Sequence, residues 1–436
     1  THTPSTTASA PTAPGSALSR RGLLAGAAAA GAAVPVLGAG AFSPAAAALP
    51  TVTPVWSEKV RRSFGIAVQP QMQKKTYGAV KVWPKYAADL GVSWIRGRYS
   101  PGLSNNDDLI AQCRALGLKW VMTLIPEDWS MSQTELRRSL AHVRDHAADL
   151  CIAIEGMNEP NHNRDGSRVR SDWAAVSVAY QKTIWDFVKS TPSMRNVSVI
   201  SPSLQMGGDP YADFVALRDA GVANYIDYAG MHSYPAGLKP DSKVDTRLEY
   251  VRKTWGAVPT WVSETGYQNA MNAPLSGPRP VPTDVAATYG PRSVLDYFTR
   301  GCKSARYELL GEPDPRNSEP EASYGLIHCP TNDPSSWTVK PEFYTMKSFV
   351  TGLKDTAASY TPAPVALQVT APSTVKWLVT GKSDGTTTLY AYLNASIWDI
   401  KDRRRLTVNP VDVVVVDRLG ARTVKVGADV VSVALR

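Results

Sequence analysis

The sequence is poor in the residues that build metal centres. Its 436 residues include six histidines and four cysteines, and no His-x-His pair follows the first predicted strand, 64–68 (FGIAV). Metal-dependent hydrolases need clusters of His or Asp at the ends of strands. The spacing of the cysteines also resembles no metal site. The sequence therefore disfavours a metal-dependent hydrolase, and we expect neither a metal nor an organic cofactor.

Concentrated positive charge is also missing. The chain has 47 Lys and Arg against 38 Asp and Glu, a formal charge of +9, but the cations are scattered along it. The one dense run, 403–405 (RRR), has acidic neighbours at Asp399, Asp402 and Asp417. We interpret it as a solvated strand edge, with a binding patch as the alternative. Nothing else resembles a nucleic-acid module, so we expect no nucleic-acid partner.

Long apolar runs are confined to the first fifty residues. A Ser/Thr/Pro/Ala-rich leader ends at Arg20 and Arg21, and a mildly apolar stretch then continues to Phe42. Small residues follow, up to Leu49 and Pro50. This order predicts a twin-arginine export signal over 1–49 and a secreted, extracellular protein. Pro35 interrupts the apolar stretch, so a stable membrane anchor is not expected.

The cysteines are even in number, which in an exported protein permits disulfides. We predict the pairs Cys302–Cys329 and Cys113–Cys151, with isolated buried thiols as the alternative.

From residue 60 onward, short apolar or aromatic runs alternate with longer helical patterns. One such pattern is "SQTELRRSLAHVRDHAADL", which begins with Ser132 and has Glu135 three residues on, as in a capping box. Eight runs read as strands: 64–68, 93–96, 120–125, 152–156, 197–201, 228–232, 260–263 and 305–309. Alternating strands and helices imply parallel strands with right-handed crossovers.

Eight strand–helix units match a closed (β/α)₈ barrel, a TIM barrel, which we place at 50–358. The competing architecture, an open doubly wound sheet, usually carries a glycine-rich loop after its first strand. Here that strand is followed by "QPQMQKKTYG", which has no such loop. From 359 to 436 the texture changes to short alternating runs broken by turn residues, such as "KWLVTGKSDG" and "VDVVVVDRLG". We predict a small antiparallel β-sandwich there.

Polar, titratable residues end five of the predicted strands. Chemistry in such barrels sits at the carboxyl ends of the strands, so this convergence predicts a site. Glu159 follows the fourth strand in "CIAIEGMNEPNHN", and Glu264 follows the seventh in "PTWVSETGYQ". The other strand ends contribute Arg96 on the second strand, His232 and Tyr234 on the sixth, and Glu308 on the eighth.

With these residues the sequence resembles the clan A glycoside hydrolases, which are barrels with catalytic glutamates after strands four and seven. The resemblance covers roughly residues 60 to 355. It includes "YELLGE" and "YGLIHCP…KPEFYTMKSF", which are similar to the last strand and closing helix of members of families 39 and 5. The motif Asn158-Glu159 matches the clan's acid/base motif, and Glu264 matches its nucleophile. The resemblance implies a retaining glycoside hydrolase.

The chemistry explains these residue types. Retention takes two carboxyl groups about 5–5.5 Å apart. Glu264 must be ionised to attack the anomeric carbon, and Glu159 must hold a proton for the leaving oxygen. The negative charge of one helps the other to keep its proton.

Other residues are assigned supporting roles. Arg96 would pair with Glu264, Tyr234 would donate its hydroxyl to the same carboxylate, and Asn158 would bind the sugar 2-hydroxyl. His232 would orient Tyr234 or contact the sugar, and Glu155, within the fourth strand, is a supporting or inward-facing carboxylate. Three aromatic residues in loops are candidate sugar subsites, with plain packing as the alternative: Trp129, Tyr267 and Trp337. Glu308 is either a site residue or a structural carboxylate.

The sequence thus predicts a secreted, monomeric enzyme that cleaves a polysaccharide or glycoconjugate by double displacement. A carbohydrate-binding barrel without catalysis is the alternative from another class. Transglycosylation uses the same site, and the pattern does not choose between it and hydrolysis. Nor does the pattern give the sugar, the linkage or the endo or exo mode, which depend on contacts from loops such as "QNAMNAPLSGPRPVPTD" after Glu264.

Overall fold

The computed structural model describes residues 49–125, 131–162, 170–206, 210–274 and 277–435. The predicted export signal and Trp129 lie outside the described residues. Among the described helices, none is both long enough and apolar enough to cross a bilayer.

Eight parallel strands form one sheet in the order β7-β6-β5-β4-β3-β10-β9-β8. Isolated parallel bridges, Ile200 with Tyr228 and Leu204 with Met231, join the two outer strands and close the sheet. The predicted (β/α)₈ barrel is thus confirmed. Its strands are β3 (Phe64–Ala67), β4 (Trp94–Arg98), β5 (Lys119–Thr123), β6 (Cys151–Glu155), β7 (Ser198–Ile200), β8 (Ala229–His232), β9 (Thr260–Thr265) and β10 (Lys303–Arg306).

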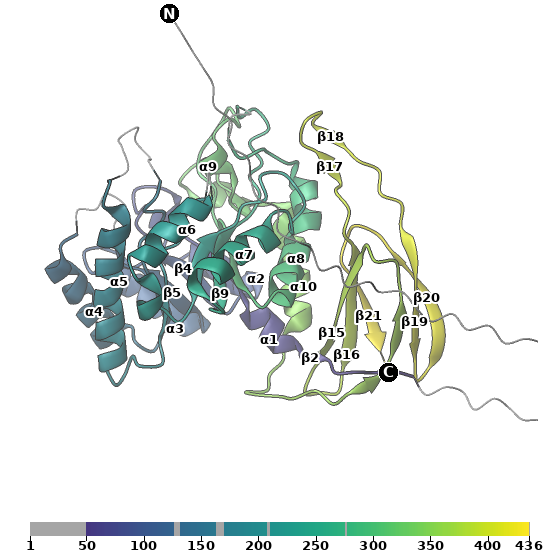
Figure 1. Ribbon diagram of the computed structural model, residues 1–436. Coiled ribbons are helices and arrows are strands. Elements are labelled where there is room, and N and C mark those ends of the chain that lie inside the picture. Colours follow the sequence, from purple (N-terminus) through teal and green to yellow (C-terminus); the bar gives the residue numbers. More distant parts are fainter. Residues whose placement is uncertain (1–48, 126–130, 163–169, 207–209, 275–276, 436) are drawn as a thin grey trace, which may run out of the picture. The chain divides into compact units, whose positions relative to one another are not determined.

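The main helices alternate with these strands and lie outside them (Figure 1). The predicted capping box is present, because the Ser132 side chain accepts from the Glu135 N–H and Glu135 reaches back to the N–H of Ser132. Gly91 ends α2 in the left-handed region, with φ 88°. The helices between strands are α2 (Trp83–Leu90), α3 (Asn106–Leu116), α4 (Gln133–His146), α5 (Trp173–Ser190), α6 (Pro210–Asp219), α7 (Val244–Trp255) and α8 (Thr283–Thr299). Outside that alternation lie α1 (Ser57–Arg62), α9 (Pro320–Ser323) and α10 (Pro341–Leu353).

A small apolar cluster made by strand residues fills one level of the barrel. Trp94 and Trp261 pack edge to face in it, with ring centroids 5.2 Å apart. Because side chains alternate along a strand, the residues two positions further on share the same face. On β4, β6 and β9 these are the polar residues Arg96, Glu155 and Ser263. A buried polar layer therefore follows the apolar one, toward the carboxyl ends of the strands.

The C-terminal segment forms two further sheets around a separate apolar cluster (Figure 1). One sheet holds β14 (Gln368–Thr370), β19 (Val411–Asp417) and β20 (Gly420–Val426). The other holds β2 (Val55–Trp56), β15 (Val375–Gly381), β16 (Thr387–Leu393) and β21 (Val431–Leu435). The predicted sandwich is confirmed, with one correction. Strand β2 comes from the N-terminal side of the barrel and pairs with β15 in parallel.

Three short two-stranded pairs complete the described strands. The run at 403–405 supplies β18, whose arginines are exposed, and Arg404 lies 3.6 Å from Asp399 and from Asp402. That is the solvated strand edge that the sequence predicts. The pairs are β17 (Trp398–Asp399) with β18 (Arg404–Arg405), β1 (Thr51–Val52) with β13 (Val365–Ala366), and β11 (Ile327–His328) with β12 (Thr338–Val339).

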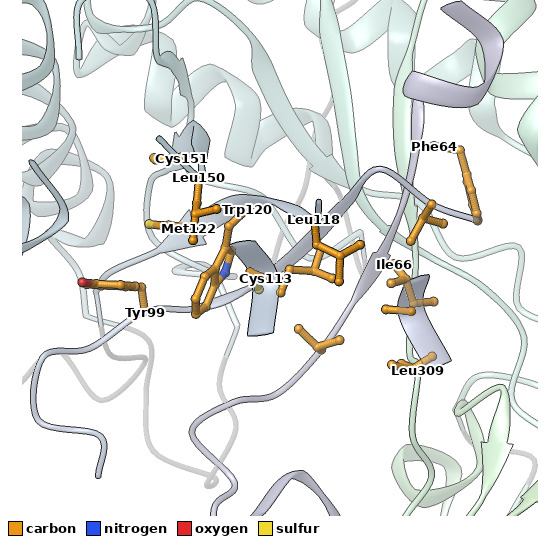
Figure 2. Close-up of a cluster of buried hydrophobic side chains, with 14 of the residues drawn as sticks. Phe64, Ile66, Tyr99, Cys113, Leu118, Trp120, Met122, Leu150, Cys151 and Leu309 are labelled. Carbon is orange, nitrogen blue, oxygen red and sulfur yellow. The ribbon is translucent and has the colours of Figure 1, made fainter. Parts of the chain in front are cut away.

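All four cysteines are free, buried thiols. The predicted disulfides are therefore wrong, and the alternative of isolated buried thiols holds. Figure 2 shows Cys113 and Cys151 among the side chains of the main apolar core, in company with Trp120. Cys302 belongs to a different apolar cluster from Cys329. Three thiols donate to nearby carbonyl oxygens: Cys151 to Ala153 at 3.6 Å, Cys329 to Ile327 at 3.6 Å and Cys302 to Arg300 at 3.9 Å.

Candidate active site

Glu159 and Glu264 are brought together by the barrel. Glu264 lies in β9, and Glu159 follows β6 by four residues. Their facing carboxylate oxygens and a ring nitrogen of His232 all lie within 4.8 Å of one another. The two carboxylates are mostly buried, with side chains 11% and 8% exposed. Two residues that are 105 positions apart in the sequence thus belong to one small polar cluster.

The backbone fixes the direction of Glu159. Its φ is 43°, in the left-handed region that non-glycine residues rarely adopt. Its N–H donates to the Ser203 carbonyl at 2.8 Å, and its own carbonyl accepts from the His162 N–H at 3.0 Å. A conformation of this kind costs about 1 kcal/mol or more and is typical of functional sites.

Arg96 connects the polar residues at the centre. Its guanidinium donates to Glu264 through Nη1, to the Asn158 amide oxygen through Nη2 at 2.6 Å, and to Glu155 through Nε at 2.8 Å. Burial alone would lower the pKa of Arg96, but the charges of Glu155 and Glu264 outweigh it and raise the pKa. Arg96 is thus a permanent cation that pairs with Glu264, as the sequence predicts, and also holds Asn158, which was not predicted.

His232 lies between the two glutamates. Its Nδ1 is 2.7 Å from Glu159 Oε1 and 3.2 Å from Glu264 Oε2. Burial would lower the pKa of His232, but the charge of Glu264 and the hydrogen bond and charge of Glu159 together raise it. The imidazole therefore couples the protonation of one carboxylate to that of the other.

Tyr234 donates its hydroxyl to Glu264 Oε2 at 2.7 Å. Its pKa is raised well above the usual value, first by burial and then by the charge of Glu264, so the hydroxyl keeps its proton. The ring packs edge to face against Tyr307 and Tyr324, with centroids 6.0 and 5.4 Å away. Packing thus fixes the hydroxyl that orients the carboxylate.

Several residues that contact the site were not predicted from the sequence. Ser203 and Ser263 donate to Glu155, Tyr307 and Tyr324 support Tyr234, and His162 Nδ1 lies 3.5 Å from Glu159 Oε2. His162 was within reach of sequence reasoning, since it stands three residues after Glu159 in the same motif. Ser203 and Tyr324 come from segments without a spacing signal.

Two predicted subsites are corrected. Tyr267 is 3% exposed, donates its hydroxyl to the Leu238 carbonyl at 2.8 Å, and packs on Tyr289. Trp337 is 8% exposed, and its indole N–H donates to the Thr331 carbonyl at 3.0 Å. Neither ring offers a free face to a sugar, so packing explains both.

Glu308 is a buried carboxyl group, 4% exposed, that shares a hydrogen bond with Tyr77. Burial raises its pKa well above the usual value, and the charges of Glu321, Glu312 and Glu264 add to the rise. The protonated, neutral form of Glu308 is therefore favoured in the folded protein. Its hydrogen bond to Tyr77, a buried residue of the main core, favours the structural interpretation.

The same centre is also the one group of His, Cys, Asp or Glu, among the described residues, with the geometry to hold a metal ion: Glu159, His232 and Glu264. However, Arg96 and Tyr234 already donate to the two oxygens of Glu264. A cation would have to displace the guanidinium or lie against it. The donor set therefore fits acid–base and nucleophilic chemistry better than metal binding.

Comparisons with known proteins show the fold. No protein-family model matches the sequence, and no curated protein matches it. Among solved structures, a glucosidase from Croceicoccus marinus aligns with a TM-score of 0.51 at 12% identity, over 81% of this chain and 76% of that one. The catalytic domain of a GH30 xylanase C from Talaromyces cellulolyticus aligns with a TM-score of 0.47 at 11% identity, over 79% of this chain and 84% of that one. The chain therefore has the (β/α)₈-barrel fold seen in the glucosidase, and the predicted resemblance to barrel glycosidases is confirmed at the level of fold.

Proposed function

We propose that this protein is a retaining glycoside hydrolase of the clan A type, acting on the O-glycosidic bonds of a polysaccharide or glycoconjugate. The observation that carries the proposal is the approach of the Glu159 and Glu264 oxygens to within 4.8 Å. Retaining enzymes hold their two carboxyl groups about 5–5.5 Å apart, whereas inverting enzymes leave about 6.5–9.5 Å for a water molecule.

In the first step, an oxygen of ionised Glu264 attacks the anomeric carbon of the sugar. Glu159 gives its proton to the glycosidic oxygen, which leaves as an alcohol, and a covalent glycosyl–enzyme ester remains. Arg96 and Tyr234 hold the Glu264 carboxylate in line for this attack. Asn158, whose amide oxygen is fixed by Arg96, presents its amide nitrogen to the sugar 2-hydroxyl.

In the second step, Glu159, now a carboxylate, takes a proton from water. The resulting nucleophile attacks the anomeric carbon, and the bond to Glu264 breaks. Two displacements at one carbon restore its configuration. A sugar hydroxyl in place of water would give transglycosylation by the same route.

The test is a panel of polysaccharides and aryl glycosides, with product configuration followed by NMR. Glu264→Ala should abolish turnover of the substrate that the wild type cleaves, and added azide should restore cleavage with an inverted glycosyl azide. Glu159→Ala with azide should give the retained azide instead. Glu249→Ala, which removes an exposed carboxylate on α7, is the control and should keep wild-type activity.

A Glu264→Ala protein with wild-type turnover would end the proposal. Sugar binding without cleavage of any substrate in the panel would instead favour a carbohydrate-binding barrel.

Export through the twin-arginine route is a separate part of the proposal, and it rests on residues 1–49 alone. Secretion of the full-length chain, and its loss in an Arg20→Lys/Arg21→Lys variant, tests it.

A further inference from the structure

The two-glutamate mechanism leaves a third carboxylate at the centre unused. Glu155 ends β6 and is 0% exposed. Burying a carboxylate is costly unless its charge is paired and its oxygens are hydrogen-bonded. Glu155 meets both conditions through residues of the active site itself, and this raises the question of what it contributes there.

The contacts of Glu155 come from β4, from β9 and from the segment after β7. Arg96 approaches it side-on, with Nε at 2.8 Å from Oε2 and Nη2 at 3.1 Å from Oε1. The hydroxyls of Ser263 and Ser203 donate to Oε1, the first at 2.7 Å. Burial alone would raise the pKa of Glu155, but the charge and hydrogen bonds of Arg96, with the charge of His232 and the Ser203 hydrogen bond, lower it. Glu155 is therefore ionised.

The remaining Nη1 of Arg96 donates to Glu264. One guanidinium thus serves two carboxylates, and its single positive charge is already balanced by Glu155. The charged or titratable groups that face this pair are Glu264 on β9, His232 on β8, Tyr234 two residues after it, and Glu159 after β6. Without Glu155, Arg96 would place an uncompensated cation beside the attacking oxygen. Such a cation would stabilise the ground-state carboxylate and oppose its transfer to the sugar carbon.

A second buried ion pair in the barrel shows what a purely structural pair looks like. Arg306 on β10 donates to Glu342 on α10 through Nε and Nη2, both at 2.7 Å. Arg306 also donates to two backbone carbonyls, those of Tyr267 and Tyr324. Buried pairs of this kind contribute little net stability compared with apolar packing. The Arg96–Glu155 pair differs, because the third nitrogen of the Arg96 guanidinium, Nη1, donates to Glu264.

We propose that Glu155 is a positioning residue for the reaction, which neutralises Arg96 and aims it so that Glu264 is oriented without being held by a full positive charge. The inference rests on the proposed function, in which Glu264 is the nucleophile. It assigns Glu155 a role in the charge balance of the site rather than in contact with the sugar.

The experiment compares Glu155→Gln with the matched control Glu342→Gln. For Glu155→Gln we expect kcat to fall about 10- to 100-fold, as for other partners that orient a reacting group, with a smaller change in KM. Both limbs of the pH profile of kcat/KM should move to lower pH, by about one unit, because the uncompensated Arg96 charge favours the carboxylate forms of both glutamates. Glu342→Gln should lose stability and leave both limbs in place.

A second measurement works without turnover. The titration of His232, followed by NMR against the five other histidines, should move to lower pKa in Glu155→Gln, since an anion is lost near the ring, and should stay unchanged in Glu342→Gln. A wild type inactive on every substrate would contradict the proposed function, while this titration would still test the charge balance. Unmoved pH limbs and an unmoved His232 titration in folded Glu155→Gln would overturn the inference.

If Glu155→Gln does not fold, Glu155→Asp and Glu342→Asp replace the pair. Each keeps its charge and withdraws the carboxylate from its arginine by one methylene. Glu155→Asp should lower kcat while both limbs stay near their wild-type positions, and Glu342→Asp should lower stability alone. Equal effects of the two variants on kcat would overturn the inference.

Discussion

The hydroxyl of Tyr234 donates to Glu264 Oε2 over 2.7 Å, whereas Arg96 donates to the other oxygen of this carboxylate, Oε1. Arg96 thus holds one oxygen, while the other accepts from Tyr234 and lies 3.2 Å from His232 Nδ1. The carboxylate is fixed in its plane, and each oxygen has a defined partner to give up when it attacks.

Tyr234→Phe should slow the reaction without unfolding the protein. A hydrogen bond to a charged group contributes about 1.5–3 kcal/mol, which corresponds to about a 10- to 100-fold fall in kcat. The ring should still pack on Tyr307 and Tyr324. Steady-state kinetics and thermal unfolding check both expectations. The control is Tyr307→Phe, whose hydroxyl donates to Glu321 at 3.1 Å. An equal loss of kcat in both variants would contradict a specific role for Tyr234.

His232→Gln should make stability less dependent on pH. The pKa of His232 is raised in the folded protein because the pull of Glu264 and Glu159 outweighs burial. Its stabilisation is therefore fully present below the ordinary pKa of about 6.5 and is lost as pH rises through the folded pKa. The wild type should exceed His232→Gln in free energy of unfolding by more at pH 5.5 than at pH 9. Urea unfolding at the two pH values measures the difference, and an equal gap at both would show that the imidazole is not charged by its neighbours.

Glu308→Gln should stabilise the protein at alkaline pH. The pKa of Glu308 is raised well above its usual value by burial and by nearby carboxylates. The folded state therefore holds a proton that the unfolded chain releases above its ordinary pKa, and stability falls as pH rises past that value. Glutamine keeps the shape and removes the titration. The melting temperature of Glu308→Gln should equal that of the wild type near pH 4 and exceed it near pH 8, whereas a lower melting temperature at pH 8 would mean that Glu308 is ionised and paired.

The sequence predicted those strands that are marked by a local pattern of apolar residues and missed those that depend on distant pairing. All eight barrel strands were located to within about three residues, because each is a short apolar run set between helical patterns. Strand β20 (Gly420–Val426) was missed, since most of its side chains are exposed and it lacks a run of large apolar residues. Strand β2 was missed because two residues carry no pattern, and its place depends on pairing with β15, more than 300 residues away.

The same distinction applies to the residues of the candidate site: some carry a local signal in the sequence and others do not. The sequence singled out five residues that the structure brings together, because polar residues at strand ends contrast with the apolar runs before them: Arg96, Glu159, His232, Tyr234 and Glu264. The charged Glu155 inside an apolar strand gave a similar contrast, although its role needed the contacts of Arg96. The aromatic subsites were predicted from loop position alone. Loop position does not tell a ring facing a cleft from a ring buried beneath it, and Tyr267 and Trp337 proved to be buried.

The thiols offer a test of the corrected disulfide prediction. All four cysteines are free and buried, and burial raises the pKa of each to about 12. A thiol reagent reacts with the thiolate, so the folded protein at pH 8 should react hardly at all. Four equivalents should react after unfolding in denaturant without reductant. The melting temperature should also be the same with and without a reducing agent, because no cross-link constrains the unfolded chain. Either of two results would show that disulfides form after all and that the thiols are not free: fewer than four reactive thiols in the unfolded, unreduced protein, or a melting temperature lowered by reductant.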